Sequence, residues 1–136
     1  MLYFGSSDWK LYAIDLATGV KKWDFTTGYA IKGTPFLSGN TIYFGSTDGT
    51  LYALDANTGA KQWAYSTSNA IISSPAILNG IIYFISSNNN LYAVDITNGK
   101  KIWSYYLDIP ATLGGSLKSP LLVSGSGQSI SAFSAR

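Results

Sequence analysis

The side chains that could carry out chemistry in this chain are few. Its 136 residues include no histidine, no cysteine, no glutamate and a single arginine, Arg136. Histidine is the usual general base and zinc ligand, and a cysteine thiolate is a common nucleophile. Serines are plentiful, but none has a histidine or a motif-placed lysine that could activate it. The sequence therefore predicts no catalytic residue.

Aspartates are the remaining candidates for acid–base work or metal binding, and they are Asp8, Asp15, Asp24, Asp48, Asp55, Asp95 and Asp108. Three of them recur 40 residues apart and two others fall at expected turns, which leaves Asp24 and Asp108. A hard cation such as Ca²⁺ takes about six to eight oxygen ligands. Two isolated carboxylates cannot supply them, so no metal site and no cofactor-binding residue is predicted.

The sequence repeats with a period of 40 residues, and three copies have a tryptophan at the same position. Trp23, Trp63 and Trp103 each follow an aspartate and a glycine at the same spacing. A fixed period of this size indicates repeated units that bury their apolar faces by stacking on one another. A buried indole N–H needs a partner, and one flat ring per unit suits a wedge between sheets. The three tryptophans are therefore interpreted as packing residues.

Each period contains signals for four short strands and none for a helix. In the second copy the segment 41–55 has two apolar runs, 42–44 and 51–54, separated by Asp48-Gly49, a pair typical of a two-residue type I′ hairpin turn. Residues 61–65 form a third run around Trp63, and 76–78 a fourth short run. The apolar residues are mostly β-branched or aromatic and occur in short runs between glycines and asparagines, which argues against helix.

The runs are apolar on both faces, which indicates sheets covered on both sides. The predicted fold is all-β: four-stranded antiparallel sheets of about 40 residues each, packed face to face as the blades of a β-propeller. We expect an open arc of about three and a half blades, divided into 1–28 (partial blade), 29–68, 69–108 and 109–136 (partial blade). Propellers close with about 4 to 8 blades. Either the chain is a segment of a longer polypeptide, or copies associate to complete a ring or stack.

The repeated segments resemble a known family. Ala13-x-Asp15-x-x-Thr18-Gly19-x-x-x-Trp23 resembles the tryptophan-docking motif of the pyrroloquinoline-quinone (PQQ)-like propeller repeats, and two more copies follow. The predicted docking residues are Ala13, Asp15, Thr18, Gly19, Trp23, Ala53, Asp55, Thr58, Gly59, Trp63, Ala93, Asp95, Asn98, Gly99 and Trp103. The resemblance implies that each indole packs between neighbouring blades while the Asp and Thr side chains satisfy backbone and indole groups.

The resemblance also frames the expected function. It implies that the quinone dehydrogenases of this family use eight blades, a Ca²⁺ beside the quinone, a catalytic aspartate and an arginine over the cofactor, a set this chain lacks. We expect instead a non-catalytic scaffold for protein–protein interaction or assembly, periplasmic or at the cell surface, similar to the propeller lipoprotein of the bacterial outer-membrane barrel-assembly machine. Two alternatives stay open: a fragment of a PQQ-dependent quinoprotein dehydrogenase, and a self-assembling surface or filament protein.

Residues that break the repeat are the candidates for partner contact. Trp9 occupies the turn position held by Gly49 and Asn89, where a bulky side chain is strained if the backbone is left-handed. It either lies on its own blade in a relaxed turn or contacts a partner, since tryptophan is enriched at binding hot spots. Further candidates of this kind are Tyr29, Tyr105 and Tyr106.

The charge of the chain argues against a nucleic-acid partner, and its hydropathy argues against a membrane-spanning segment. The net charge is +2 and the lysines are scattered, which is too little for a nucleic-acid surface. No apolar stretch reaches the length of a transmembrane segment. The expected partner is another protein, or a second copy bound through the terminal blades.

Overall fold

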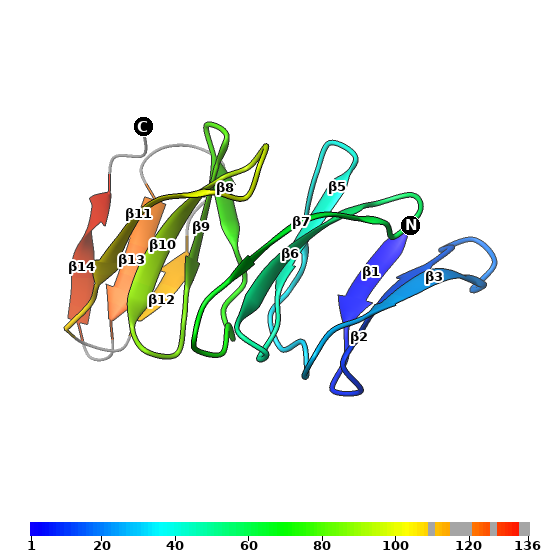
Figure 1. Cartoon of the computed structure of the whole chain (residues 1–136), viewed down its shortest axis with the longest axis horizontal. Helices are drawn as coiled ribbons and strands as arrows, with labels where there is room; N and C mark the ends of the chain where they lie inside the picture. Colours follow the sequence, from blue (N-terminus) through cyan, green and yellow to red (C-terminus); the bar gives the residue numbers. More distant parts are fainter. Residues whose placement is uncertain (109–110, 115–120, 126–127, 134–136) are drawn as a thin grey trace.

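The computed structural model of the chain describes residues 1–108, 111–114, 121–125 and 128–133. All regular structure within these residues is β, and it forms four antiparallel sheets. Figure 1 shows the amino-terminal sheet at the right, the sheet of β5, β6 and β7 next to it, and the sheets that contain β9 and β13 overlapping at the left. The four sheets are called blades one to four below.

The two outer blades have three described strands and the two central blades have four. Blade one contains β1 (Leu2–Gly5), β2 (Lys10–Ile14) and β3 (Lys21–Thr26). Blade two contains β4 (Phe36–Ser38), β5 (Thr41–Gly45), β6 (Thr50–Asp55) and β7 (Lys61–Ser66). Blade three contains β8 (Ala76–Leu78), β9 (Ile81–Ile85), β10 (Asn90–Asp95) and β11 (Lys101–Tyr106). Blade four contains β12 (Ala111–Gly114), β13 (Leu121–Gly125) and β14 (Gln128–Phe133). The predicted all-β fold of antiparallel sheets is confirmed.

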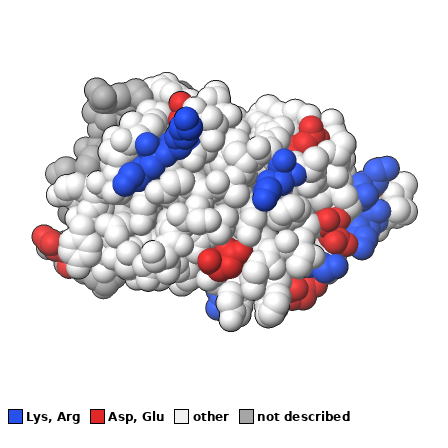
Figure 2. All heavy atoms as spheres, viewed as in Figure 1, with Lys and Arg blue, Asp and Glu red and all other residues white. Residues whose placement is uncertain are grey.

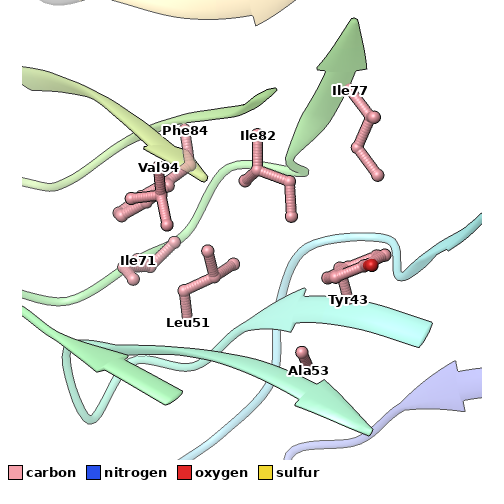
Figure 3. Close-up of a cluster of buried hydrophobic side chains, with 8 residues drawn as sticks. All are labelled: Tyr43, Leu51, Ala53, Ile71, Ile77, Ile82, Phe84 and Val94. Carbon is pink, nitrogen blue, oxygen red and sulfur yellow. The ribbon is translucent and has the colours of Figure 1, made fainter. Parts of the chain in front are cut away.

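Two of the three clusters of buried apolar residues join neighbouring blades, and the third, around Tyr83 and Leu91, lies on blade three. One cluster joins blades two and three through Tyr43, Leu51, Ala53, Ile71, Ile77, Ile82, Phe84 and Val94 (Figure 3). A second cluster joins blades one and two around Leu11 and Phe44, which are both fully buried. Strands apolar on both faces are required because each central blade is covered on both sides. Stacking therefore buries apolar side chains of both blades at each of these two interfaces.

The hairpin at Asp48-Gly49 differs from the predicted type I′ turn. The amide of Gly49 donates to the carbonyl of Ser46 at 3.1 Å, and the amide of Ser46 donates to the carbonyl of Thr50 at 3.0 Å. Gly49 alone in the turn has a positive φ, +89°. This geometry is a type I turn followed by one left-handed residue. The longer loop forms because Asp48 accepts the amide of Thr50, at 2.8 Å, and the Ser46 hydroxyl accepts the amide of Asp48.

The type I′ geometry does occur elsewhere in the chain. Between β8 and β9, Asn79 and Gly80 both have positive φ, +53° and +76°. Leu78 and Ile81 face each other across these two residues. A two-residue turn with both central residues left-handed is the type I′ form. Asn-Gly therefore adopts the turn that was predicted for Asp-Gly.

Candidate functional site

The docking loop of blade two is closed by the side chain of Asp55. Its carboxylate accepts the amide of Asn57 at 2.9 Å and the amide of Thr58 at 3.0 Å. The Gly59 amide donates to the carbonyl of Asp55 at 2.8 Å, and the Thr58 hydroxyl accepts the amide of Ala60 at 3.2 Å. Gly59 has φ +77°, a conformation that costs glycine little. These bonds lie within the loop, so it forms without contributions from other blades.

The other two copies form the same loop. In blade one, the carboxylate of Asp15 accepts the amides of Ala17, at 2.9 Å, and Thr18, at 3.1 Å. In blade three, asparagine replaces the threonine, and the Asn98 side-chain oxygen accepts the amide of Lys100 at 2.9 Å. The one departure from the repeated motif therefore preserves the bond that closes the loop.

Trp23 on β3 docks onto the loop of the next blade. Its indole N–H donates to the carbonyl of Ala56 at 3.1 Å, and the Tyr3 hydroxyl donates to the same carbonyl at 3.0 Å. The ring lies directly on Gly59, where an added Cβ would come within 2.7 Å of ring atom Cδ2. Glycine is therefore required here both for its left-handed φ and for the close approach of the indole.

Trp63 on β7 repeats this arrangement one blade further. Its indole N–H donates to the carbonyl of Ile96 at 3.0 Å. A Cβ on Gly99 would lie 2.4 Å from ring atom Cε3. Trp103 on β11 is half-buried, with its ring centroid 5.9 Å from that of Tyr83. The two described interfaces therefore share one stereochemistry.

The acceptor of the indole N–H differs from the one that the resemblance implied. In both interfaces the acceptor is a backbone carbonyl, on Ala56 or Ile96, and not an aspartate or threonine side chain. Those side chains bind the amides of their own loop instead. Each acceptor stands 33 residues after its tryptophan. In the sequence, only this fixed offset could have pointed to the acceptor. Every residue carries a backbone carbonyl, so the residue type gives no signal.

The alanine of the motif lies beside the tryptophan within the same blade. Ala13, Ala53 and Ala93 are fully buried, and Ala53 faces Trp63 across the β6–β7 ladder. A register shift follows each alanine on the way to the docking loop. A bulge of this kind re-aims the side chains around it. The motif therefore includes both the donor ring and the strand irregularity next to it.

Trp9 and Tyr29 form an exposed aromatic pair at the β1–β2 turn of blade one. Their ring centroids are 5.3 Å apart at an interplanar angle of 56°. The Trp9 residue is 46% exposed and Tyr29 is 58% exposed. Trp9 has φ +76°, so the expectation of a relaxed turn is wrong. The Trp9 carbonyl accepts the amide of Thr27 at 2.8 Å, which fixes the strained turn to the end of β3.

The two other predicted contact residues lie on a different blade. Tyr105 and Tyr106 are on β11, where they face Leu91 and Asn90 of β10. They are 56% and 60% exposed. The four residues singled out as partner contacts are therefore divided: Trp9 is in the β1–β2 turn, Tyr29 is in the connection between β3 and β4, and the other two are on blade three.

The carboxylates of Asp15, Asp24 and Asp95 are engaged by neighbouring groups. The pKa of Asp15 is lowered chiefly by the backbone amides of its loop, and the pKa of Asp95 chiefly by the hydroxyl of Thr97. A hydrogen bond from Lys21 lowers the pKa of Asp24, which also forms an ion pair with Lys10 at 3.3 Å. These acids stay ionised at neutral pH in structural roles.

The described residues do not fit the calcium and quinone site of the family's dehydrogenases. Within 1–108 and the described strands that follow, no three His, Cys, Asp or Glu side chains are grouped so that they could hold a metal ion. The carboxylate of Asp48, for example, is bound by the Gly28 amide and the Tyr52 hydroxyl. Figure 2 shows the Lys and Asp side chains in small groups of mixed sign, several of them at the right end, with wide uncharged surface between the groups on the face in view. No helix in the described part of the chain is long and apolar enough to span a bilayer.

Comparison with known proteins places the fold. A family model described as "Outer membrane protein assembly factor BamB" matches residues 7–135. No curated protein matches the chain. The crystal structure of BamB from Moraxella catarrhalis is similar with a TM-score of 0.75 and 19% sequence identity, over 97% of this chain and 44% of that one.

Two further solved structures share the fold. A computationally designed protein, Ika8, is similar with a TM-score of 0.81 and 16% identity, over 98% of this chain and 42% of that one. A europium-containing methanol dehydrogenase gives 0.69 and 22%, over 79% of this chain and 23% of that one. The chain thus spans less than half the length of each of these structures. The predicted partial β-propeller is confirmed.

Proposed function

The chain belongs to the BamB-like family of PQQ-repeat β-propellers, and from this membership we propose that it is a non-catalytic scaffold that binds a protein partner outside the cytoplasm. Its place would be the periplasm or the cell surface. The observation that carries the proposal is the exposed pair of Trp9 and Tyr29. The repeated residues are used for packing, whereas this pair occurs in one copy and leaves both rings accessible to solvent.

The backbone at Trp9 supports a role in binding. The other two copies have Gly49 and Asn89 at this position, with φ of +89° and +64°. Trp9 adopts the same conformation at +76°. A bulky residue in this region costs about 1–2 kcal/mol. Strain of this kind persists where another function requires the side chain, so the exposed indole is the favoured contact for a partner.

Tyr29 is positioned to support that contact. Its carbonyl accepts hydrogen bonds from the hydroxyls of Thr27, at 2.6 Å, and Ser46, at 3.2 Å. Ser46 belongs to blade two, so the backbone of Tyr29 is anchored at the junction of two blades. An aromatic side chain on a rigid backbone loses little entropy on binding. The pair therefore forms a preorganised apolar surface.

Photo-cross-linking tests the proposal. A photoreactive phenylalanine at Trp9, in the native host, is expected to yield one discrete adduct in the envelope fraction. Unlabelled wild-type protein should compete for that adduct, whereas the Trp9→Gly protein should not, because it restores the glycine of the second copy without the ring. Ile102, which is 48% exposed on blade three, is the matched control position. Equal adducts at both positions, or none at Trp9, would refute the proposal.

The dehydrogenase alternative has a separate test. PQQ and Ca²⁺ are titrated together into the protein while the visible absorption band of PQQ is followed. Because no three acidic side chains of the described residues are grouped to hold a metal ion, and Asp24 and Asp55 are bound in an ion pair and a loop, no saturable change is expected. A calcium-dependent, saturable band shift would favour a quinoprotein fragment over a scaffold.

A further inference from the structure

Two asparagines of the chain are each followed by a glycine, in Asn79-Gly80 and Asn98-Gly99. Such a pair can modify itself, because the backbone nitrogen of the glycine can attack the side-chain carbonyl carbon of the asparagine. Glycine has no Cβ that would hinder this approach. The fold places the two pairs in different surroundings, so we expect them to react at different rates.

The pair Asn98-Gly99 is held in the docking loop of blade three. The Asn98 side-chain oxygen accepts the amide of Lys100 at 2.9 Å, and the Gly99 amide donates to the carbonyl of Asp95 at 2.9 Å. Gly99 is also buried, with the ring of Trp63 lying on it. Both reacting groups must therefore leave a hydrogen bond before they can meet.

The pair Asn79-Gly80 has none of these restraints. It forms the type I′ turn between β8 and β9, and both residues are exposed. In the part of the chain that the structure describes, no group forms a hydrogen bond with the Asn79 side chain or with the Gly80 amide. A Cβ on Gly80 would meet only the Cγ2 atom of Ile96, at 3.9 Å. The side chain and the attacking nitrogen can therefore approach each other at the surface.

The equivalent turn of blade two does not contain the reactive pair. It has the two residue types in reverse order, as Gly39-Asn40. Asn40 is followed by Thr41, whose branched Cβ crowds the backbone nitrogen that would attack. The Asn40 side-chain nitrogen also donates to the carboxylate of Asp55 at 3.3 Å. Blade three therefore has a reactive turn where blade two has an unreactive one.

We propose that Asn79 is a site of spontaneous deamidation in the folded protein. The Gly80 nitrogen forms a bond to Cγ of Asn79 and gives up its proton. The bond between Cγ and the side-chain nitrogen breaks, and ammonia leaves with that proton. Water then opens the resulting imide ring, and no group is oxidised or reduced. Attack of water at Cγ gives aspartate, whereas attack at the main-chain carbonyl carbon gives isoaspartate.

The modified turn is connected to the docking of Trp63. The Gly80 carbonyl accepts the amide of Ile96 at 3.1 Å, and the Ile96 carbonyl accepts the indole N–H of Trp63 at 3.0 Å. Isoaspartate adds one carbon atom to the backbone of a two-residue turn and a carboxylate at its surface. The Gly80 carbonyl then no longer matches the position of the Ile96 amide. Modification of Asn79 therefore loosens the acceptor that joins blades two and three.

Mass spectrometry of the intact chain, incubated in mildly alkaline buffer and then cut by chymotrypsin, tests the inference. Chymotrypsin cleaves after Tyr83 and Tyr92, so Asn79 and Asn98 fall in different peptides. In the folded protein Asn79 should be deamidated at least about tenfold faster than Asn98. Two hydrogen bonds must first break at Asn98, and a barrier higher by about 1.4 kcal/mol slows a reaction about tenfold.

The same incubation in urea is the matched control for the effect of the fold. Both pairs are then unrestrained, and Asn79 and Asn98 should react at similar rates. Equal rates in the folded protein, or a faster reaction at Asn98, would overturn the proposal. A difference in rate that persists in urea would also overturn it, because the sequence and not the fold would then cause the difference.

A variant with the two turn residues exchanged tests the structural consequence. Asn79→Gly combined with Gly80→Asn gives blade three the Gly-Asn order of blade two, and this turn should stay unmodified during the incubation. The modified fraction of the wild type has an additional negative charge, so ion exchange separates it. Its Ile96 amide should exchange hydrogen faster than that of the unmodified fraction, whereas the incubated variant should show no such change. Equal exchange in both wild-type fractions would overturn the link to Trp63.

The site is separate from the exposed pair of Trp9 and Tyr29 on which the proposed function rests. Deamidation at Asn79 requires no partner protein, and its measurement uses the purified chain alone. The cross-linking test at Trp9 and the deamidation test can therefore fail independently.

Discussion

At the scale of single residues, the interfaces depend on a pairing of the largest side chain with the smallest. Trp23 and Trp63 each lie on a glycine of the next blade and donate to a carbonyl of the same loop. The ring gains apolar contact and a hydrogen-bond partner at once, which is the usual requirement for a buried tryptophan. This combination explains why the repeated motif keeps both residues at a fixed spacing.

Truncation of the central indole is expected to be costly. Trp63→Ala removes a half-buried ring packed against Tyr43 of its own blade and against the loop of blade three. The free energy of unfolding should fall by about 3–5 kcal/mol. Urea denaturation measures the change, with Ile102→Ala on an exposed strand position as the control. A loss below about 1 kcal/mol would show that the ring does not hold the blades together.

Sequence patterns identified the donor rings and their glycines but not the acceptors. The spacing of Trp23, Gly59 and their copies is visible in the residues themselves. The carbonyl of Ala56 has no such signature, because its role depends on how two blades are placed. Trp9 was recognised as a residue that breaks the repeat, yet its contact with Tyr29 requires the path of the chain after β3. Local chemistry was therefore predictable where long-range placement was not.

At the scale of elements, the docking loops are held by carboxylates that must be ionised. Asp15 and Asp95 accept hydrogen bonds from their own loops, and this lowers the pKa of each. A group whose pKa is lower in the folded state stabilises that state above its unfolded pKa of about 3.9. The contribution is lost as the pH falls through the folded value. Both carboxylates are exposed, so solvent screening limits the effect.

Acid should therefore weaken the loops selectively. The wild type is expected to keep a constant urea midpoint from neutral pH down to about pH 5 and to lose stability below about pH 4. Asp95→Asn retains a side-chain oxygen acceptor but not the charge. The variant should show a smaller loss between these pH values than the wild type. Superimposable pH profiles would indicate that the pKa shift at Asp95 does not contribute.

The docking loops of Gly19 and Gly59 differ in one respect: the ring of Trp23 lies on Gly59, and no described atom lies near a Cβ on Gly19. This difference leads to a second prediction about the loops. Gly19→Ala and Gly59→Ala force the same left-handed backbone on alanine, which costs about 1–2 kcal/mol. Only Gly59→Ala also drives a Cβ toward the ring of Trp23, at 2.7 Å, and overpacking adds about 1–3 kcal/mol. Thermal or urea unfolding should therefore rank Gly59→Ala well below Gly19→Ala. Equal stabilities would show that the ring moves aside without cost.

The hairpins show where turn chemistry is ambiguous from sequence. Asp48-Gly49 and Asn79-Gly80 both match the two-residue turn pattern, but only the latter forms it. The difference lies in Ser46, whose hydroxyl and carbonyl bind the amides of a three-residue loop. A dipeptide rule does not include that residue. The strands themselves were predictable because their apolar runs are bounded by glycine and asparagine.

At the scale of the whole molecule, stability should vary along the arc. Repeats of this kind gain stability from nearest neighbours. Blade two is covered on both sides, whereas Leu2 and Phe4 of blade one are exposed. The overall fold was predictable from the period and the two-sided apolar strands, since stacking is the only way to bury both faces. The identity of a partner was not, because the sequence records only this side of any interface.

Hydrogen exchange should reveal this gradient. The amides of β1 are expected to exchange faster than the corresponding amides of β5 and β9, because opening blade one breaks one interface instead of two. Mass spectrometry or NMR of the intact chain measures the difference. Uniform protection across the three strands would contradict the nearest-neighbour description.

The shared stereochemistry of the two interfaces has a consequence for how such a chain can change length. Because Trp23 and Trp63 meet equivalent loops in equivalent ways, excising residues 29–68 would bring the first ring onto the loop of Gly99 with no new kind of junction. Duplicating the same stretch would add one more identical joint. Genetic gain or loss of a whole 40-residue period therefore keeps the same contact between indole and loop at each interface. An insertion or deletion of any other length would place the tryptophan out of register with the loop.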